Sequence, residues 1–97
     1  MTLLWKKRFI PMILGGEKTA TRRLRRPRVS AGKSYRVRAG FFTYLPHRIL
    51  VESVYRQPLS EVSDADVRRE GYPGVAEFRG AWDPSESVWV VEFRLHP

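Results

Sequence analysis

One short segment of the chain gathers side chains that are able to do chemistry. The glycine pair Gly15 and Gly16 ends an apolar run, and a lysine, two threonines and two arginines follow at once. Glycine adopts the backbone conformations that a tight turn needs, and side chains of an extended segment alternate between two faces. The segment is therefore expected to present Lys18, Thr21 and Arg23 around one small volume, an arrangement that suits anion binding or proton transfer.

A second candidate for chemistry is Glu70, which stands directly before Gly71 at the end of a predicted helix. A carboxylate at the negative end of a helix dipole is disfavoured by about 0.3–1 kcal/mol, so a nearby cation is expected to compensate it. One candidate for this cation is Arg68 or Arg69 on the same helix. The alternative is Lys18, reaching across a cleft.

These residues carry a resemblance to a known family. The sequence resembles the ASCH domain, a PUA-like family associated with RNA, in which a Gly-x-Lys-x-x-(Glu or Thr)-x-Arg motif follows the first helix. Gly16, Lys18, Thr21 and Arg23 match that motif. The resemblance extends over nearly the whole chain, from a first helix at Phe9 to Leu14 to a closing strand at Val88 to Leu95, and it implies binding to RNA.

One branch of this family, similar to bacterial N4-acetylcytidine amidohydrolases, uses a lysine, a threonine and a glutamate, and Lys18, Thr21 and Glu70 fall on those positions. The resemblance implies amide hydrolysis in which Glu70 moves protons, Lys18 stabilises the developing anion or activates a hydroxyl, and Thr21 attacks or orients water. RNA cleavage and a protein-binding adaptor role are less favoured alternatives. Whether the protein is an enzyme stays open.

The charge of the chain independently favours a polyanionic partner. The formal net charge is +8. Thirteen lysines and arginines stand against Glu17 alone between Met1 and Arg48, while the second half is net acidic. This asymmetry predicts a basic face that holds RNA phosphates, beside a cleft bounded by Lys18, Thr21, Arg23 and Glu70 that accepts an exposed nucleotide. The residues expected to contact RNA are Lys6, Lys7, Arg8, Lys18, Arg22, Arg23, Arg25, Arg26, Arg28, Arg36, Arg38, Phe41 and Tyr44.

Other classes of site find little support in the residue content. Cysteine is absent, and the two histidines, His47 and His96, are far apart in sequence, so neither a metal nor another cofactor is expected. Both histidines are expected to have surface or packing roles. The apolar runs near the N-terminus are too short for a signal core or a membrane span. We therefore expect a cytoplasmic protein without a membrane partner.

The elements that must position these residues follow from periodicity and from turn residues. The pattern predicts one α+β domain over residues 1–97, a small PUA-like β-barrel with two or three short helices. Extended segments are expected at Lys18–Leu24, Ser34–Ala39, Arg48–Arg56 and Ser87–Leu95, and helices at Arg8–Leu14, from Ser63 to Gly71, and at Gly74–Trp82. Gly40 to His47 is expected to connect two strands.

The aromatic residues divide into expected core and expected surface. Spacing assigns Phe78, Trp82, Trp89 and Phe93 to the core, and it allows Trp5 and Tyr72 to border the cleft. Phe41, Phe42 and Tyr44 are expected either to plug one end of the barrel or to stack on unpaired bases.

Overall fold

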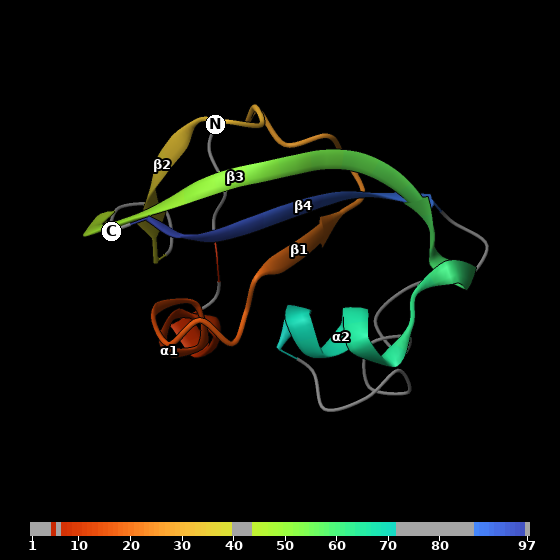
Figure 1. The fold of residues 1–97 in the computed structure, drawn as a ribbon, viewed down its shortest axis with the longest axis horizontal. Helices are drawn as coiled ribbons and strands as arrows, with labels where there is room; N and C mark the ends of the chain where they lie inside the picture. The colour runs from red at the N-terminus through yellow and green to blue at the C-terminus, as the bar shows by residue number, and fades with distance from the viewer. Residues whose placement is uncertain (1–4, 6, 40–43, 72–86, 97) are drawn as a thin grey trace.

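The computed structural model describes residues 5, 7–39, 44–71 and 87–96 of the chain. Within them, short helices and four strands follow one another along the chain (Figure 1). They are η1 (Lys7–Phe9), α1 (Ile10–Leu14), β1 (Ala20–Arg23), β2 (Ser34–Arg38), β3 (Tyr44–Pro58), η2 (Leu59–Glu61), α2 (Asp64–Glu70) and β4 (Ser87–His96). The expectations for Lys6, Phe41, Phe42, Tyr72, Phe78, Trp82 and the helix at Gly74–Trp82 lie outside the described residues.

The four strands form one antiparallel sheet in the order β1-β4-β3-β2. The long strands β3 and β4 run side by side through its centre (Figure 1). In the register of β1 on β4, Thr21 lies opposite Val91 and Arg22 lies opposite Val90. Directly opposed residues of an antiparallel pair share a face of the sheet. Thr21 and Arg22 therefore belong to opposite faces.

The expected closed barrel is not confirmed. Strands β1 and β2 are the two edges of the sheet, and no pairing joins them in the part of the chain that the structure describes. The edge strands hold four and five residues, against 15 in β3. Four strands, two of them this short, are few for closing a sheet on itself. The fold is thus an open, curved sheet with short helices, which keeps the predicted α+β class.

Among the described residues, two buried clusters hold the sheet to the segments around it. The larger one joins Trp5, Ile13 of α1 and Phe93 of β4, with further valines and Ile49, and the smaller one joins Val67 of α2 to Val88 of β4. The ring centroids of Trp5 and Phe93 are 5.5 Å apart. Trp5 is therefore a core residue and does not border a cleft.

Local signals set the limits of helix α2 as the sequence predicts. The hydroxyl of Ser63 accepts a hydrogen bond from the backbone N–H of Asp66, and the Asp66 carboxylate accepts one from the backbone N–H of Ser63. This reciprocal capping satisfies two otherwise unpaired backbone donors. Gly71 ends the helix with a φ of 94°. Glu70 is consequently fixed as the last helical residue, and α2 contacts β1 (Figure 1).

The strands differ from expectation at two places. Strand β3 begins at Tyr44, so part of the segment expected to be a connection is paired with β2. The register of this pair shifts between Arg36 and Arg38, and both Val37 and Arg38 are buried. Arg38, which was expected to contact RNA, is therefore not an exposed cation.

Among the described helices, none is long and apolar enough to cross a membrane.

Candidate functional site

The turn before β1 is held by backbone hydrogen bonds that fix the position of Lys18. Gly16 has a φ of 81°, a conformation that favours glycine. The backbone N–H of Lys18 donates to the carbonyl of Met12 at 3.0 Å, and that of Thr19 donates to the carbonyl of Arg69 in α2 at 2.9 Å. The turn is thereby tied both to α1 and to the end of α2.

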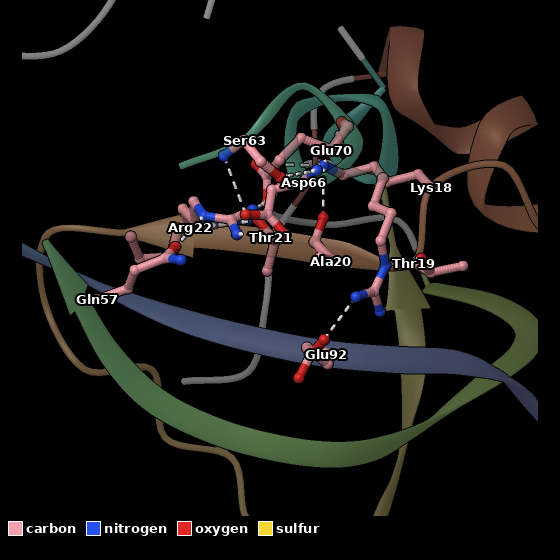
Figure 2. A network of polar contacts seen from close by, with 12 residues as sticks. Lys18, Thr19, Ala20, Thr21, Arg22, Gln57, Ser63, Asp66, Glu70 and Glu92 are labelled. Carbon is pink, nitrogen blue, oxygen red and sulfur yellow. Dashed lines mark hydrogen bonds and ion pairs between the residues drawn. The ribbon is translucent and has the colours of Figure 1, made fainter. Parts of the chain in front are cut away.

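The Lys18 side chain is buried, with 2% of its surface exposed. Its ammonium donates to the backbone carbonyl of Ala20 at 3.0 Å and to that of Glu70 at 2.6 Å. The Nζ atom lies 3.7 Å from Oε1 of Glu70 and 4.6 Å from the centre of the Phe9 ring. Of the two alternatives considered for Glu70, the structure thus shows the contact with the distant Lys18 (Figure 2).

Glu70 is also buried and has a second cationic partner, Arg22. The Arg22 Nη1 group donates to Oε2 of Glu70 at 3.2 Å. Arg69, one of the two local partners considered, instead donates to Glu92 at 2.6 Å. We call Lys18, Arg22 and Glu70 the buried ion cluster. Its cations come from around β1 and its anion from α2, which offsets the cost of a carboxylate at a helix end.

Arg22 is not an exposed phosphate contact, contrary to expectation, because only 3% of its surface is accessible. Besides Glu70, its Nε donates to the amide oxygen of Gln57 at 3.1 Å, and its Nη2 lies 3.8 Å from Asp66 (Figure 2). The sequence holds a signal for this role. Lys18, Ala20 and Arg22 alternate along an extended segment, so Arg22 falls on the face that meets α2.

The third predicted catalytic residue, Thr21, is buried but stands apart from this cluster. Its hydroxyl accepts a hydrogen bond from Nε of Arg23 at 3.2 Å. No contact in the described part of the chain joins it to Lys18 or Glu70. Side chains two residues apart in a strand share a face, so Thr21 lies on the face of β1 that carries Arg23, opposite Val91 and Trp89 of β4. The structure therefore unites two of the three residues and leaves Thr21 on the other face.

Burial changes the proton affinity of both members of the Lys18–Glu70 pair. Removal from water lowers the pKa of Lys18 to about 8, although the Glu70 carboxylate partly offsets the effect. Burial likewise raises the pKa of Glu70 above its ordinary value, against the opposing effect of Lys18 and Arg22. Burial also lowers the pKa of Arg23. An amine with a pKa near neutrality is suited to proton transfer or nucleophilic attack.

A small hollow adjoins the buried ion cluster. It has a volume of about 150 Å³ and is lined by Arg8, Phe9, Met12 and Gly71. Phe9 contacts the Lys18 ammonium, and Gly71 directly follows Glu70. The hollow thus reaches the neighbours of the cluster, while Lys18, Thr21 and Glu70 themselves are buried and do not line it.

Most of the other residues expected to contact RNA lie on the surface. Lys7, Arg8, Arg25, Arg26, Arg28 and Arg36 are exposed. Arg23 is half-buried, and Arg38 is 7% exposed. Tyr44 is 49% exposed, and its ring contacts the guanidiniums of Arg36 and Arg38 at 5.5 and 4.8 Å. An exposed aromatic ring flanked by cations fits the base-stacking alternative for Tyr44 and does not fit a plug at the end of a barrel.

Trp89 departs from its predicted core position. It is half-buried and belongs to neither buried cluster. The guanidiniums of Arg26 and Arg56 lie 4.7 and 5.6 Å from the centre of its ring. The alternation of residue types grouped Trp89 with Val91 and Phe93, which lie on the same face of β4. Trp89 lies nearer the end of the sheet, where its neighbours are arginines and not apolar residues.

The two histidines, distant in sequence, meet at one end of the sheet. With Pro46 and Arg48 they line a hollow of about 290 Å³. The register of β3 on β4 explains their proximity, because Arg48 lies opposite His96. In residues 5, 7–39, 44–71 and 87–96, no three histidines or acidic residues group as metal ligands would.

No family model and no curated protein matches this sequence. Several solved structures share its fold. An ASCH domain from Lactobacillus crispatus superimposes with a TM-score of 0.74 at 17% identity, over 88% of this chain and 68% of that one. A mutant of the Zymomonas mobilis protein ZmASCH has a TM-score of 0.74 at 16% identity, over 96% of this chain and 67% of that one. A DUF984 protein from Enterococcus faecalis has a TM-score of 0.73 at 18% identity, over 99% of this chain and 77% of that one. The chain therefore has the ASCH-domain fold.

Proposed function

We propose that this protein is an ASCH-type module that binds RNA through an exposed basic surface. The observation that carries the proposal is the arrangement of charge over residues 7–39. Six of the expected RNA-contacting cations are exposed there, together with Lys33, and Glu17 is the one acidic residue of that range. Such a density of cations without neighbouring acids attracts a polyanion, and arginine in particular matches phosphate with paired N–H groups.

The proposal predicts a steep dependence of RNA binding on salt. If about six phosphates of a single strand are contacted, the affinity is expected to fall roughly 300-fold between 50 and 200 mM salt. The measurement is fluorescence anisotropy of a labelled single-stranded RNA titrated with the full chain at several salt concentrations. A DNA strand of the same sequence is the control for recognition of the 2′-hydroxyl. An affinity that does not change with salt contradicts binding led by phosphate contacts.

A second candidate function, hydrolysis of an amide such as N4-acetylcytidine, is favoured by the Lys18–Glu70 pair. A buried amine with a pKa of about 8, held 3.7 Å from a carboxylate, has the groups needed for nucleophilic or acid–base catalysis. In this proposal, Glu70 carries protons and Lys18 stabilises the developing anion or activates the attacking group. Thr21 acts only if substrate binding brings it into reach, since it lies on the other face of β1.

Turnover distinguishes the enzyme from the binding module. Purified protein is incubated with N4-acetylcytidine, and cytidine is followed by chromatography. We expect Lys18→Met and Glu70→Gln to abolish product formation. Arg68→Ala, an exposed change on the same helix as Glu70, is the control that keeps activity. Activity that survives both cluster substitutions rules out this mechanism.

A further inference from the structure

Arg26, Arg56 and Trp89 form an aromatic and cationic surface, which we call the Trp89 patch. The guanidinium carbons of Arg26 and Arg56 lie 4.7 and 5.6 Å from the centre of the indole ring. Both arginines are exposed, and Trp89 is half-buried. The patch joins the loop after β1 to the end of β3 and the start of β4, so it exists only in the folded chain.

The strand register places the patch next to Arg23, the last residue of the Gly16–Arg23 motif. Trp89 lies opposite Arg56 on β3 and opposite Arg23 on β1, so these three side chains share one face of the sheet. In the next row of that face lies Thr21, whose hydroxyl accepts a hydrogen bond from Arg23. Thr21 is 3% exposed and Val91 is fully buried, so the accessible part of this face ends at the half-buried Arg23.

Among the described residues, no ion pair compensates the charge of the patch. In the described part of the chain, no carboxylate forms an ion pair with Arg26 or Arg56; the ion pairs of this part use Lys18, Arg22, Arg69 and Arg94. Two cations near one indole ring repel each other, and a neighbouring anion relieves that repulsion. Among the described residues the patch has no such anion, so a negatively charged ligand would supply it.

The indole also prepares the two arginines for binding. A guanidinium held over an aromatic ring loses side-chain freedom before the ligand arrives, which reduces the entropy cost of binding. Because both arginines are exposed, N–H groups of their guanidiniums stay available to the two oxygens of a phosphate. This combination favours a phosphate over a single carboxylate on a flexible side chain.

We propose that the Trp89 patch binds backbone phosphates of single-stranded RNA. The inference rests on the proposed RNA-binding function and deepens it, because it assigns phosphate contacts to Arg26 and Arg56 and a positioning role to Trp89. Arg56 lies in the net acidic half of the sequence, and Trp89 has the spacing of a core residue. The folded arrangement is what brings them to the basic surface.

The first test measures binding of fluorescein-labelled oligouridylate to the full chain by anisotropy, over a series of salt concentrations. We expect Arg26→Ala and Arg56→Ala each to weaken binding about fivefold at 0.1 M salt and to lower the slope of log affinity against log salt by about 0.7. Arg68→Ala is the matched control, an exposed arginine on α2 whose loss changes the net charge equally. Its effect is expected to be smaller in both measurements.

The second test follows the indole N–H signals by NMR, with the signal of Trp89 assigned through Trp89→Phe. Addition of oligouridylate is expected to shift the Trp89 signal and to leave that of Trp5, which is 4% exposed, unchanged. A role of Trp89 that is only structural predicts no such shift. Thermal unfolding of each variant verifies that it is folded at the temperature of the binding measurement.

The possible results separate the inference from the function on which it rests. If the wild-type chain binds oligouridylate but Arg26→Ala and Arg56→Ala behave like Arg68→Ala, the patch is wrong and the RNA-binding function stands. If the wild-type chain does not bind at low salt, both are wrong. If polyglutamate of equal charge displaces the RNA as well as unlabelled RNA does, the patch is a contact for acidic proteins, and the assignment to RNA is overturned.

Discussion

At the scale of single residues, the protonation of Lys18 is linked to folding. The pKa of Lys18 is about 8 in the folded protein, against 10.5 as its ordinary value. Between these values the unfolded chain binds more protons than the folded one, so the free energy of unfolding contributed by Lys18 rises with pH across this window. The full change is on the order of 3 kcal/mol.

The measurement is urea unfolding from pH 7 to 10.5 for the wild-type protein and for Lys18→Met. The difference in stability between wild type and variant is expected to shift in favour of the wild type as pH rises. Since the other titrating groups are common to both proteins, they cancel in the difference. Parallel pH profiles for the two proteins contradict a lowered pKa of Lys18.

Removal of the Glu70 carboxylate is expected to destabilise the fold strongly. Glu70→Ala leaves Lys18 and Arg22 buried without their shared anion, and loss of one partner of a buried pair costs about 3–5 kcal/mol. Glu61→Ala is the control, because Glu61 is exposed and a surface change of this kind costs about 0.5 kcal/mol or less. Similar unfolding midpoints in urea for the two variants disprove a structural role of the cluster.

The sequence predicted the Lys18–Glu70 pair but not the whole cluster. The carboxylate at a helix end called for a cation but left Arg68, Arg69 and Lys18 open, and the resemblance to the family motif was what pointed to Lys18. Arg22 was missed because its charge suggested the surface, although its spacing from Lys18 placed it on the face that meets α2. Trp89 was wrongly assigned to the core because its spacing matched that of the apolar residues. The spacing did not show that arginines surround it at the end of the sheet.

At the scale of elements, the end of α2 depends on a glycine for two reasons. Gly71 has a φ of 94°, and an added Cβ would lie 2.8 Å from the sulfur of Met12. We expect Gly71→Ala to cost about 2–3 kcal/mol, from backbone strain and from crowding of α1 against α2. Gly32→Ala is the control, since Gly32 has a similar φ of 85° with open space around it, and strain alone costs about 1 kcal/mol. Equal losses in thermal unfolding show that the contact with Met12 has no effect.

The limits of α2 were predictable because the signals are local. Ser63, Asp66 and Gly71 act within one or two turns of the chain, and their chemistry does not depend on distant contacts. The start of β3 was not predictable in this way. Tyr44 belongs to the strand because it pairs with Arg38 of β2, a contact that no local pattern of residues specifies.

At the scale of the whole molecule, a net charge of +8 on 97 residues opposes compaction. At 0.1 M salt, exposed charges that are more than about 10 Å apart are largely screened from one another. We expect the melting temperature to rise when sodium chloride increases from about 20 to about 200 mM, since salt at that level screens exposed charges effectively. A variant with Arg25→Glu and Arg28→Glu is expected to gain less, because it carries less excess charge. A melting temperature that falls with salt in both proteins contradicts net repulsion.

Closure of the sheet is the whole-molecule property that sequence patterns could not determine. Periodicity identified the four strands approximately, and the order β1-β4-β3-β2 follows from pairings between segments far apart in the chain. A barrel requires the edges β1 and β2 to meet, and this depends on strand lengths and curvature rather than on alternation of residue types. The α+β class is therefore confirmed, while the expected barrel is not.

The hydrogen bonds of Lys18 bear both on the reactivity of its amine and on the attachment of α2 to the edge of the sheet. As an ammonium, its nitrogen has three N–H groups; it donates to the carbonyls of Ala20 and Glu70 and lies 3.7 Å from a carboxylate oxygen of Glu70. When it becomes a neutral amine, it keeps two N–H groups and gains a lone pair. These two N–H groups suffice for the carbonyls of Ala20 and Glu70, so the attraction between Lys18 and the Glu70 carboxylate is what weakens. Alkaline pH is therefore expected to free the lone pair of the amine while the hydrogen bonds that join the last turn of α2 to the edge of the sheet are kept.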